Sequence, residues 1–313
     1  MTDLEFVAMQ KSTSVRSRPM PVSARLLRPA LAGLSALAAP LAASLAERLF
    51  LTPPRHPQPA DEASSLASAR VTRIDAGTPI TAWTWGQGPA VLLVHGWGGR
   101  GAQLAHFVAP LMTSGCSVVT FDAPGHGQSP ARRSSLVAFV KAIHAVSRAL
   151  GPVRGVIAHS IGAAASAVAL RDGLRADAAV FLAPPADLTL HADMILETLG
   201  FGRRARELMR ERVERRLGVS WSTLDVATFA PAMRTPLLVV HDRDDAEVPW
   251  QEGALIAQAW PGATLSTTSG LGHRRLVRDR EVVAESASFV LTALRRRQAR
   301  TPAAEPIMAS SLA

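Results

Sequence analysis

A serine between a short apolar run and a helix of small residues is the strongest sign of chemistry in the sequence. It lies in Ala158-His159-Ser160-Ile161-Gly162, after Gly155-Val156-Ile157 and before Ala163-Ala164-Ala165-Ser166. A serine on such a strand-to-helix turn has a strained backbone that exposes its Oγ, and small neighbours allow the turn. The backbone N–H of Ile161 and the amino end of the helix favour negative charge that develops beside the hydroxyl. These residues predict a nucleophilic Ser160, provided that other polar groups meet it.

Four further polar segments each follow an apolar run. They are residues 95–99 (His-Gly-Trp-Gly-Gly), 122–129 (Asp-Ala-Pro-Gly-His-Gly-Gln-Ser), 241–249 (His-Asp-Arg-Asp-Asp-Ala-Glu-Val-Pro) and 270–273 (Gly-Leu-Gly-His). Glycines in the first segment let backbone N–H groups point into a site. A serine hydroxyl is a weak nucleophile that needs a base within hydrogen-bond reach, held by a third group. These segments offer histidines and carboxylates for both roles.

Strands that alternate with helices are expected to position these segments. Continuous apolar strands separated by helices are typical of an α/β fold, a predominantly parallel sheet with helices on both faces. Active sites of such sheets lie at the carboxyl ends of the strands, where every polar segment falls. The expected strands are residues 80–85, 90–94, 117–121, 155–158, 179–182, 237–240 and, more polar, 263–267, and the expected helices are residues 103–112, 135–150, 163–171, 252–259 and 280–297.

The stretch between Pro185 and Pro236 interrupts the alternation of strands and helices. It holds no strand-like run, and its pattern is mostly helical. From Arg203 to Arg216, glutamates alternate with arginines while apolar residues recur at helical spacing, which predicts a solvated helix with ion pairs three and four residues apart. We expect a small helical cap at about residues 186–234, over the end of the sheet.

Taken together, these motifs resemble the α/β-hydrolase fold family, over roughly residues 78–297. The resemblance implies Ser160 as nucleophile, His273 as its general base and Asp245 as the carboxylate that orients the imidazole. It also implies an oxyanion hole made by the backbone N–H groups of Trp97 and Ile161. The chain departs from the family pattern at Ala158, where the family usually has glycine, and alanine is the mildest replacement.

More than one residue could be the carboxylate that orients His273, because residues 241–249 hold several carboxylates. The family's spacing places the acid four residues before Pro249, at Asp245, and Asp244 stays open as a second candidate. Asp242 is expected to cap or brace the turn, and Glu247 to be solvated.

The other histidines have structural interpretations. His95 and His126 lie in turns that the family uses structurally, and we expect them to brace those loops. His159 either shapes the pocket or packs beneath the cap. Arg274 and Arg275 are expected to form surface ion pairs. The alternative is that they bind an anionic substrate.

A serine nucleophile excludes the dehalogenases and epoxide hydrolases of this family, which form an ester on an aspartate. We predict a serine hydrolase that cleaves a small to medium carboxylic ester through an acyl-Ser160 intermediate. The same triad also serves thioesterases and C–C bond hydrolases, which remain alternatives. From a different class, the fold can serve as a non-catalytic binding protein.

Composition limits the remaining classes. The chain has 313 residues, 48% hydrophobic and 19% charged, which is typical of a globular protein. Its net charge of +9 comes mostly from arginine, but no nucleic-acid motif accompanies the charge, so we expect no nucleic-acid partner. Neither a phosphate loop nor a dinucleotide fingerprint is present, so no cofactor is expected, and no Cys/His cluster has metal-ligand spacing. Cys116, in an apolar run, is expected to be a buried, inert thiol.

The first 70 residues differ from the hydrolase-like part at 71–300. Arginines precede an uncharged Ala/Leu-rich stretch, Pro29 to Ala46. Three interpretations stay open: a helix packed on the outside of the domain, a membrane anchor, or a cleaved export signal. The first predicts a cytoplasmic protein, and the others predict a membrane-associated or exported one. Residues 301–313 are expected to form a flexible tail.

Overall fold

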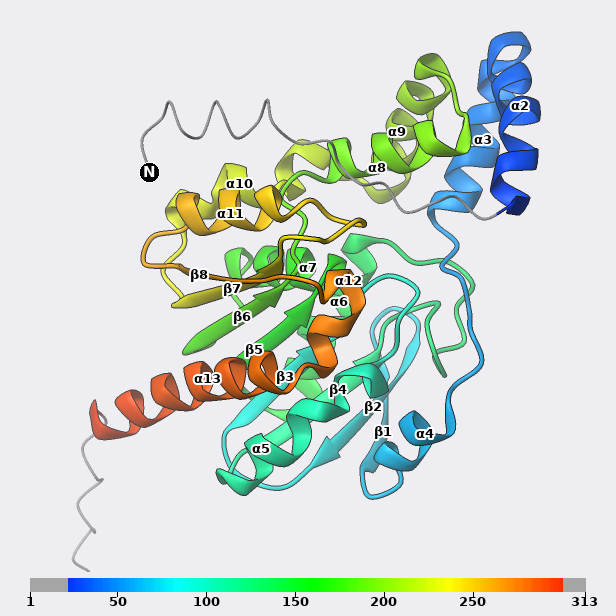
Figure 1. Cartoon of the computed structure of the whole chain (residues 1–313). Coiled ribbons are helices and arrows are strands. Elements are labelled where there is room, and N and C mark those ends of the chain that lie inside the picture. Colours follow the sequence, from blue (N-terminus) through cyan, green and yellow to red (C-terminus); the bar gives the residue numbers. More distant parts are fainter. Residues whose placement is uncertain (1–21, 301–313) are drawn as a thin grey trace, which may run out of the picture.

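The computed structural model describes residues 22–300 and has one eight-stranded sheet at its centre (Figure 1). The strand order is β1-β2-β4-β3-β5-β6-β7-β8. The pairs β1–β2 and β2–β4 are antiparallel, and all other neighbours are parallel, which confirms the predicted fold class. The strands are β1 (Arg70–Asp75), β2 (Pro79–Trp85), β3 (Ala90–Val94), β4 (Ser117–Asp122), β5 (Val153–His159), β6 (Ala178–Leu182), β7 (Leu237–Asp242) and β8 (Thr264–Thr268).

Every strand expected from the sequence is present, but β1 was not expected. It is an edge strand that pairs with β2 alone, and Ile74 is its one buried residue. Because β1 buries so little apolar surface, its sequence carries no clear strand pattern. By contrast, the central strands are buried almost throughout, since helices cover both of their faces.

Two layers of helices cover the sheet. One face packs against α6 (Leu136–Leu150), α7 (Ile161–Arg171) and α11 (Trp250–Ala259). The other packs against α5 (Val108–Thr113) and α13 (Arg280–Arg300). The expected helix over residues 103–112 is instead a 3-10 helix, Gly101–Phe107, followed by the short α5. Three short helices complete this part: α4 (Ala60–Leu66), α10 (Val226–Phe229) and α12 (Gly272–Arg275).

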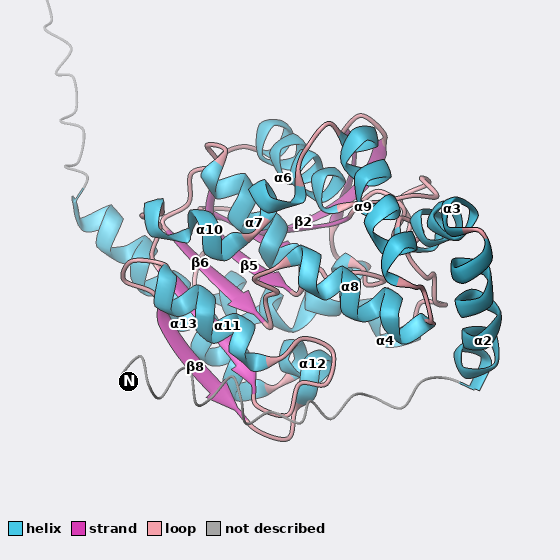
Figure 2. Cartoon of the chain, turned by 90° about the horizontal axis from the view of Figure 1, so that it is seen from above, coloured by secondary structure: helices cyan, strands magenta, loops and turns pink. Residues whose placement is uncertain are grey.

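The stretch between β6 and β7 forms helices above the carboxyl ends of the strands. Its two main helices are α8 (Leu188–Leu199) and α9 (Arg203–Leu217), followed by a 3-10 helix, Trp221–Leu224. The amino-terminal part adds a second pair, α2 (Val22–Leu37) and α3 (Ala39–Phe50), at the outer edge of the molecule beside α9 (Figure 2).

The stretch Pro29 to Ala46 is therefore two helices rather than one. The break falls at Ala38, and Pro40 stands in the first turn of α3, where its missing N–H costs no helical hydrogen bond. Alanines 42, 43 and 46 of α3 pack with Met209 and Val213 of α9 in one apolar cluster. The buried Glu47 accepts hydrogen bonds from Arg212 (2.9 Å) and Arg216 (2.6 Å). Helix α3 is thereby tied to the cap.

None of the helices within residues 22–300 is both long enough and apolar enough to cross a membrane. Residues 1–21, which begin the amino-terminal extension, and the expected tail at 301–313 lie outside the described residues.

Candidate active site

The turn between β5 and α7 holds Ser160 in an unusual backbone conformation. Its φ is 54° and its ψ is −128°, a region that costs roughly 1–3 kcal/mol for a residue other than glycine. Two close approaches impose this turn. A Cβ at position 162 would lie 2.9 Å from the carbonyl oxygen of Val94, and one at position 96 would lie 3.0 Å from Cβ of Ser160. Glycine at both positions therefore allows β3 and its loop to pack against the serine.

A short hydrogen bond joins two of the predicted residues. Nδ1 of His273, on α12, lies 2.7 Å from Oδ2 of Asp245, in the loop after β7. Because a carboxylate only accepts, Nδ1 of His273 donates this bond, and in the neutral ring Nε2 is then the acceptor nitrogen. The other oxygen, Oδ1, accepts the backbone N–H groups of Glu247 (2.8 Å) and Val248 (2.9 Å).

The Asp245 side chain is fully buried but stays ionised. Burial opposes its ionisation, whereas hydrogen bonds from His241 and His273 favour it, so the pKa of this carboxyl lies well below its usual value. His241 is itself fully buried and donates from Nε2 to the carbonyl of Val248 (3.0 Å). The carboxylate is thus fixed on both sides, and its charge faces His273.

The neighbouring carboxylates have other partners. Asp244 is exposed and accepts the backbone N–H of Gly270 (2.8 Å). Asp242 accepts from Thr268 Oγ1 (2.7 Å) and from the N–H of Leu271, and so braces the turn as predicted. Arg274 donates two hydrogen bonds of 2.9 and 3.1 Å to Glu247, which is the ion pair expected of Arg274, whereas Glu247 was expected to be solvated. The structure places Asp245, and not Asp244, at His273.

A cavity of about 750 Å³ opens above these residues, between the sheet and the cap. Ser160, Ile161, Trp97 and His273 all line it. Most of its remaining wall is apolar and comes from three distant parts of the chain, the end of α3, the loop after β3, and the cap: Leu49, Phe50, Leu51, Leu104, Leu188, Met194, Ile195, Leu196, Leu199, Val213, Leu217, Trp221 and Leu224. The contribution of α3 was not expected from the sequence.

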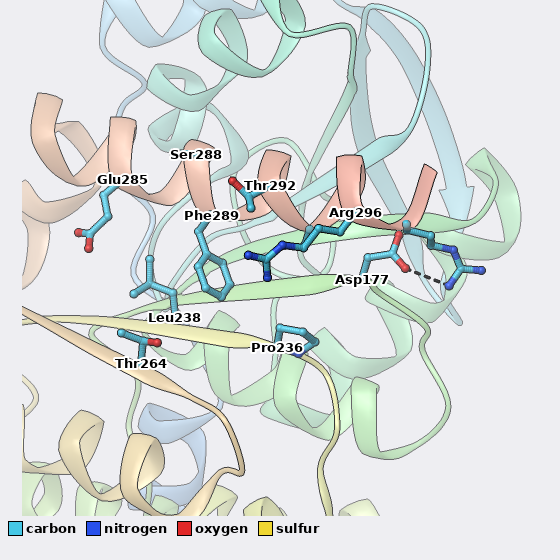
Figure 3. Close-up of a pocket in the computed structure, with 11 residues that line it drawn as sticks. Asp177, Pro236, Leu238, Thr264, Glu285, Ser288, Phe289, Thr292 and Arg296 are labelled. Atoms are coloured by element: carbon cyan, nitrogen blue, oxygen red, sulfur yellow. Dashed lines mark hydrogen bonds and ion pairs between the residues drawn. The ribbon is translucent and has the colours of Figure 1, made fainter. Parts of the chain in front are cut away.

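A second hollow, of about 990 Å³, lies on another part of the molecule (Figure 3). It runs along α13 near the amino ends of β6, β7 and β8, beside Asp177, Pro236 and Thr264. Phe289 and Arg296 cover it, and none of the predicted site residues lines it. Ligands of parallel sheets bind at the carboxyl ends, so the cavity at Ser160 is the candidate active site.

Comparison with known proteins agrees with this geometry. A model of the alpha/beta hydrolase family matches residues 91–286, more than half of the chain. The chain belongs to the alpha/beta hydrolase family.

Relatives of this hydrolase-family chain include esterases. A pimeloyl-[acyl-carrier protein] methyl ester esterase of Methylococcus capsulatus is 49% identical over 47 residues, which are 15% of this chain and 18% of the relative. The chain therefore aligns with less than a fifth of that protein's length. Among solved structures, an esterase from Exiguobacterium antarcticum superposes with a TM-score of 0.57 at 15% identity, covering 70% of this chain and 98% of that one. The esterase RhEst1 from Rhodococcus sp. ECU1013 gives 0.53 at 18% identity, covering 72% and 98%. At these identities the structural matches show the fold alone.

Within this family fold, two histidines brace the loops around the site, as predicted. His95 donates from Nδ1 to the carbonyl of Gly96 (2.7 Å) and accepts the N–H of Ala123 at Nε2 (3.0 Å). Burial, with repulsion from His126, holds the pKa of His95 well below its ordinary value. His126 lies 3.0 Å from the carbonyl of Pro124 through Nδ1, and burial lowers its pKa to about 4.

His159, which precedes Ser160, contacts the backbone of His273. Its Nε2 lies 3.0 Å from the backbone carbonyl of His273, and the two rings lie 4.7 Å apart. Burial, followed by repulsion from His273, lowers the pKa of His159 to about 3, so the ring is a neutral donor. His159 also lines the cavity, so it shapes the pocket and supports His273.

Sequence reasoning missed His191, a cavity-lining residue of α8. Its Nδ1 is buried and has no hydrogen-bond partner among the described residues. Burial, then repulsion from His273, lowers the pKa of His191 to about 4, which makes the ring neutral. A histidine within a helical pattern carries no motif, so its position was detectable only in the folded chain.

Proposed function

We propose that the chain is a serine hydrolase that cleaves small to medium, uncharged carboxylic esters. The observation that carries the proposal is the 2.7 Å bond between Asp245 and His273, beside a strained Ser160 in one apolar cavity. A serine hydroxyl, a histidine whose Nδ1 is held by a carboxylate, and that buried carboxylate together match the requirements of acyl transfer. The match to an esterase sequence supports an ester as the substrate class.

The first half of the proposed reaction acylates the enzyme. Ser160 Oγ attacks the ester carbonyl while Nε2 of His273 takes its proton, and Asp245 stabilises the imidazolium that forms. The negative oxygen of the tetrahedral intermediate is held by the backbone N–H groups of Ile161 and Trp97. Each such donor is worth about 2.7–4 kcal/mol in the transition state. When the intermediate collapses, the imidazolium gives its proton to the departing alkoxide, and the acyl group stays on Ser160.

The second half hydrolyses the acyl-Ser160 ester. Nε2 of His273 takes a proton from water, the hydroxide attacks the acyl carbon, and the same two N–H groups bind the oxyanion. Collapse of this second intermediate returns the proton to Ser160 Oγ and releases the carboxylic acid. The apolar wall of the cavity binds the acyl chain throughout.

Two features favour an uncharged substrate. His191 and His159 are neutral in the cavity because burial lowers the pKa of each. Arg274, which also lines the cavity, donates two hydrogen bonds to Glu247. Thioester cleavage by the same residues remains the second candidate within the class.

The test is hydrolysis of p-nitrophenyl esters from acetate to dodecanoate by the wild type and Ser160→Ala. We expect turnover of short and medium esters, lost in Ser160→Ala by a factor of roughly 10⁴ or more. The profile over chain length measures the part of the cavity that binds the acyl group. A folded wild type that hydrolyses none of these esters would contradict the proposal, and a thioester series would then separate a thioesterase from a non-catalytic binding protein.

A further inference from the structure

Exposed apolar side chains are concentrated on the amino-terminal helices α2 and α3 and on the cap helix α8. Among the described residues, nine large hydrophobic side chains are exposed, and seven of them lie on α2, α3 and α8. These seven are Leu26, Leu27, Leu37, Leu41, Leu49, Leu190 and Ile195, and the most exposed are Leu37 at 90% and Leu26 at 75%. Single exposed leucines are common on protein surfaces, but such a concentration indicates a contact with another apolar phase or partner.

The outer helices of this group, α2 and α3, carry excess positive charge. Their sequences hold three arginines and no lysine, against one acid, whereas α8 holds no arginine and two acids, which lie near Arg206 of α9. Arg28 and Arg48 are exposed on the outer pair, whereas Glu47, the one acid of that pair, is buried against Arg212 and Arg216. The outer pair therefore presents leucine and arginine to its surroundings, a combination that suits an anionic lipid surface.

The exposed apolar residues also reach the candidate active site. Leu49 of α3 and Ile195 of α8 are 46% and 44% exposed, yet both line the cavity that holds Ser160. The rim of the cavity is thus apolar on the side where α3 and α8 lie. An apolar ester dissolved in a lipid layer against this rim reaches the cavity without crossing water.

We propose that α2, α3 and α8 form a peripheral docking face for an anionic lipid surface, from which apolar ester substrates enter the cavity. The statement about substrates rests on the proposed ester hydrolysis, whereas docking itself does not. Leucines of the face enter the interface between headgroups and acyl chains, and the arginines pair with the anionic headgroups. Figures 1 and 2 show α2 and α3 as the outermost helices of this part of the molecule, so no other described element stands in front of them.

The experiment is co-sedimentation of the full chain with phosphatidylcholine vesicles that contain or lack phosphatidylglycerol. The test variant is Leu37→Asp with Leu41→Asp, since neither leucine lines the cavity or belongs to the buried clusters. The matched control is Val71→Asp with Met112→Asp, the two exposed apolar residues that lie on other faces. Hydrolysis of soluble p-nitrophenyl acetate is measured in parallel for all three proteins.

We expect the wild type and the control to bind the anionic vesicles, and the test variant to bind at least tenfold more weakly. Binding should weaken as salt rises, because surface charges are screened. All three proteins should hydrolyse the soluble ester equally. A wild type that stays in the supernatant with anionic vesicles, or a test variant that binds as the wild type does, overturns the proposal. So does a wild-type dimer that the test variant converts to monomer without any vesicle binding. Loss of soluble ester hydrolysis in every protein would instead count against the proposed function.

Discussion

At the scale of single residues, the resemblance to a known family predicted that Asp245 orients His273, and the structure brings these two side chains together. Nδ1 of His273 lies 2.7 Å from Oδ2 of Asp245, although four carboxylates share the loop of Asp245. What could not be predicted is the support around the pair. His159 and His191 approach the pair from distant segments, and no spacing along the chain encodes their positions.

Asp245 provides the sharpest residue-scale prediction. Asp245→Asn keeps the shape of the side chain but can donate to Nδ1 of His273, which favours the wrong tautomer for a base. We expect kcat to fall by roughly 10⁴ with little change in KM. Asp244→Asn is the matched control, because Asp244 is exposed and its side chain accepts the backbone N–H of Gly270 rather than contacting His273. Steady-state kinetics on a p-nitrophenyl ester decide the point, and equal losses in both variants would contradict the role of Asp245.

At the scale of elements, the buried Glu47 ties α3 to α9. Glu47→Gln removes the charge that two arginines share, so we expect unfolding free energy to fall by about 1–3 kcal/mol. The control is Glu211→Gln on α9, whose pair with Arg215 spans 3.8 Å with both side chains largely exposed. That variant should stay within about 0.5 kcal/mol of the wild type. Urea denaturation measures both, and an unchanged Glu47→Gln protein would show that the ion pair does not hold the helices together.

Glu252, in the first turn of α11, makes stability depend on pH. Its Oε2 accepts the N–H of Ala186 (2.8 Å), at the start of the cap, and burial raises the pKa of Glu252 to about 7. Since the folded state binds this proton more tightly than the unfolded chain, stability from this group is present below pH 4.5 and is lost as pH rises to 7.

Glu252→Gln cannot ionise and keeps an acceptor for Ala186. We therefore expect the variant to gain stability over the wild type at pH 8, by up to about 3 kcal/mol at 1.36 kcal/mol per pKa unit. The gain should shrink towards zero at pH 5. Thermal unfolding at the two pH values measures this gain. A stability difference between variant and wild type that is the same at both pH values would argue against a raised pKa of Glu252.

At the scale of the whole molecule, the cavity is built from parts that no local pattern connects. The sheet, its parallel order and the helical stretch before β7 follow from patterns within single elements. The placement of residues 22–50 against the cap does not, since it depends on alanine packing and on ion pairs between residues 165 and 169 positions apart. Similarly, the polar edge strand β1 buries too little to be recognised.

Phe50 tests whether α3 shapes substrate preference. It lines the cavity and stacks on Trp221 with ring centroids 5.3 Å apart. Phe50→Ala widens the cavity, so the ratio of kcat/KM for long over short esters should rise severalfold. Phe289→Ala, in the hollow along α13, is the matched control and should leave that ratio unchanged. A ratio that responds only to Phe289 would place the acyl chain in the other hollow.

The central claim is that Ser160 is a nucleophile activated by His273 and Asp245. The most direct measurement is labelling of the full chain by a fluorophosphonate, with the modified peptide located by mass spectrometry. The account predicts one label, on Ser160, absent from Ser160→Ala and strongly slowed in His273→Ala. Labelling at another serine, or a folded wild type that takes no label while a known serine esterase does, would contradict it.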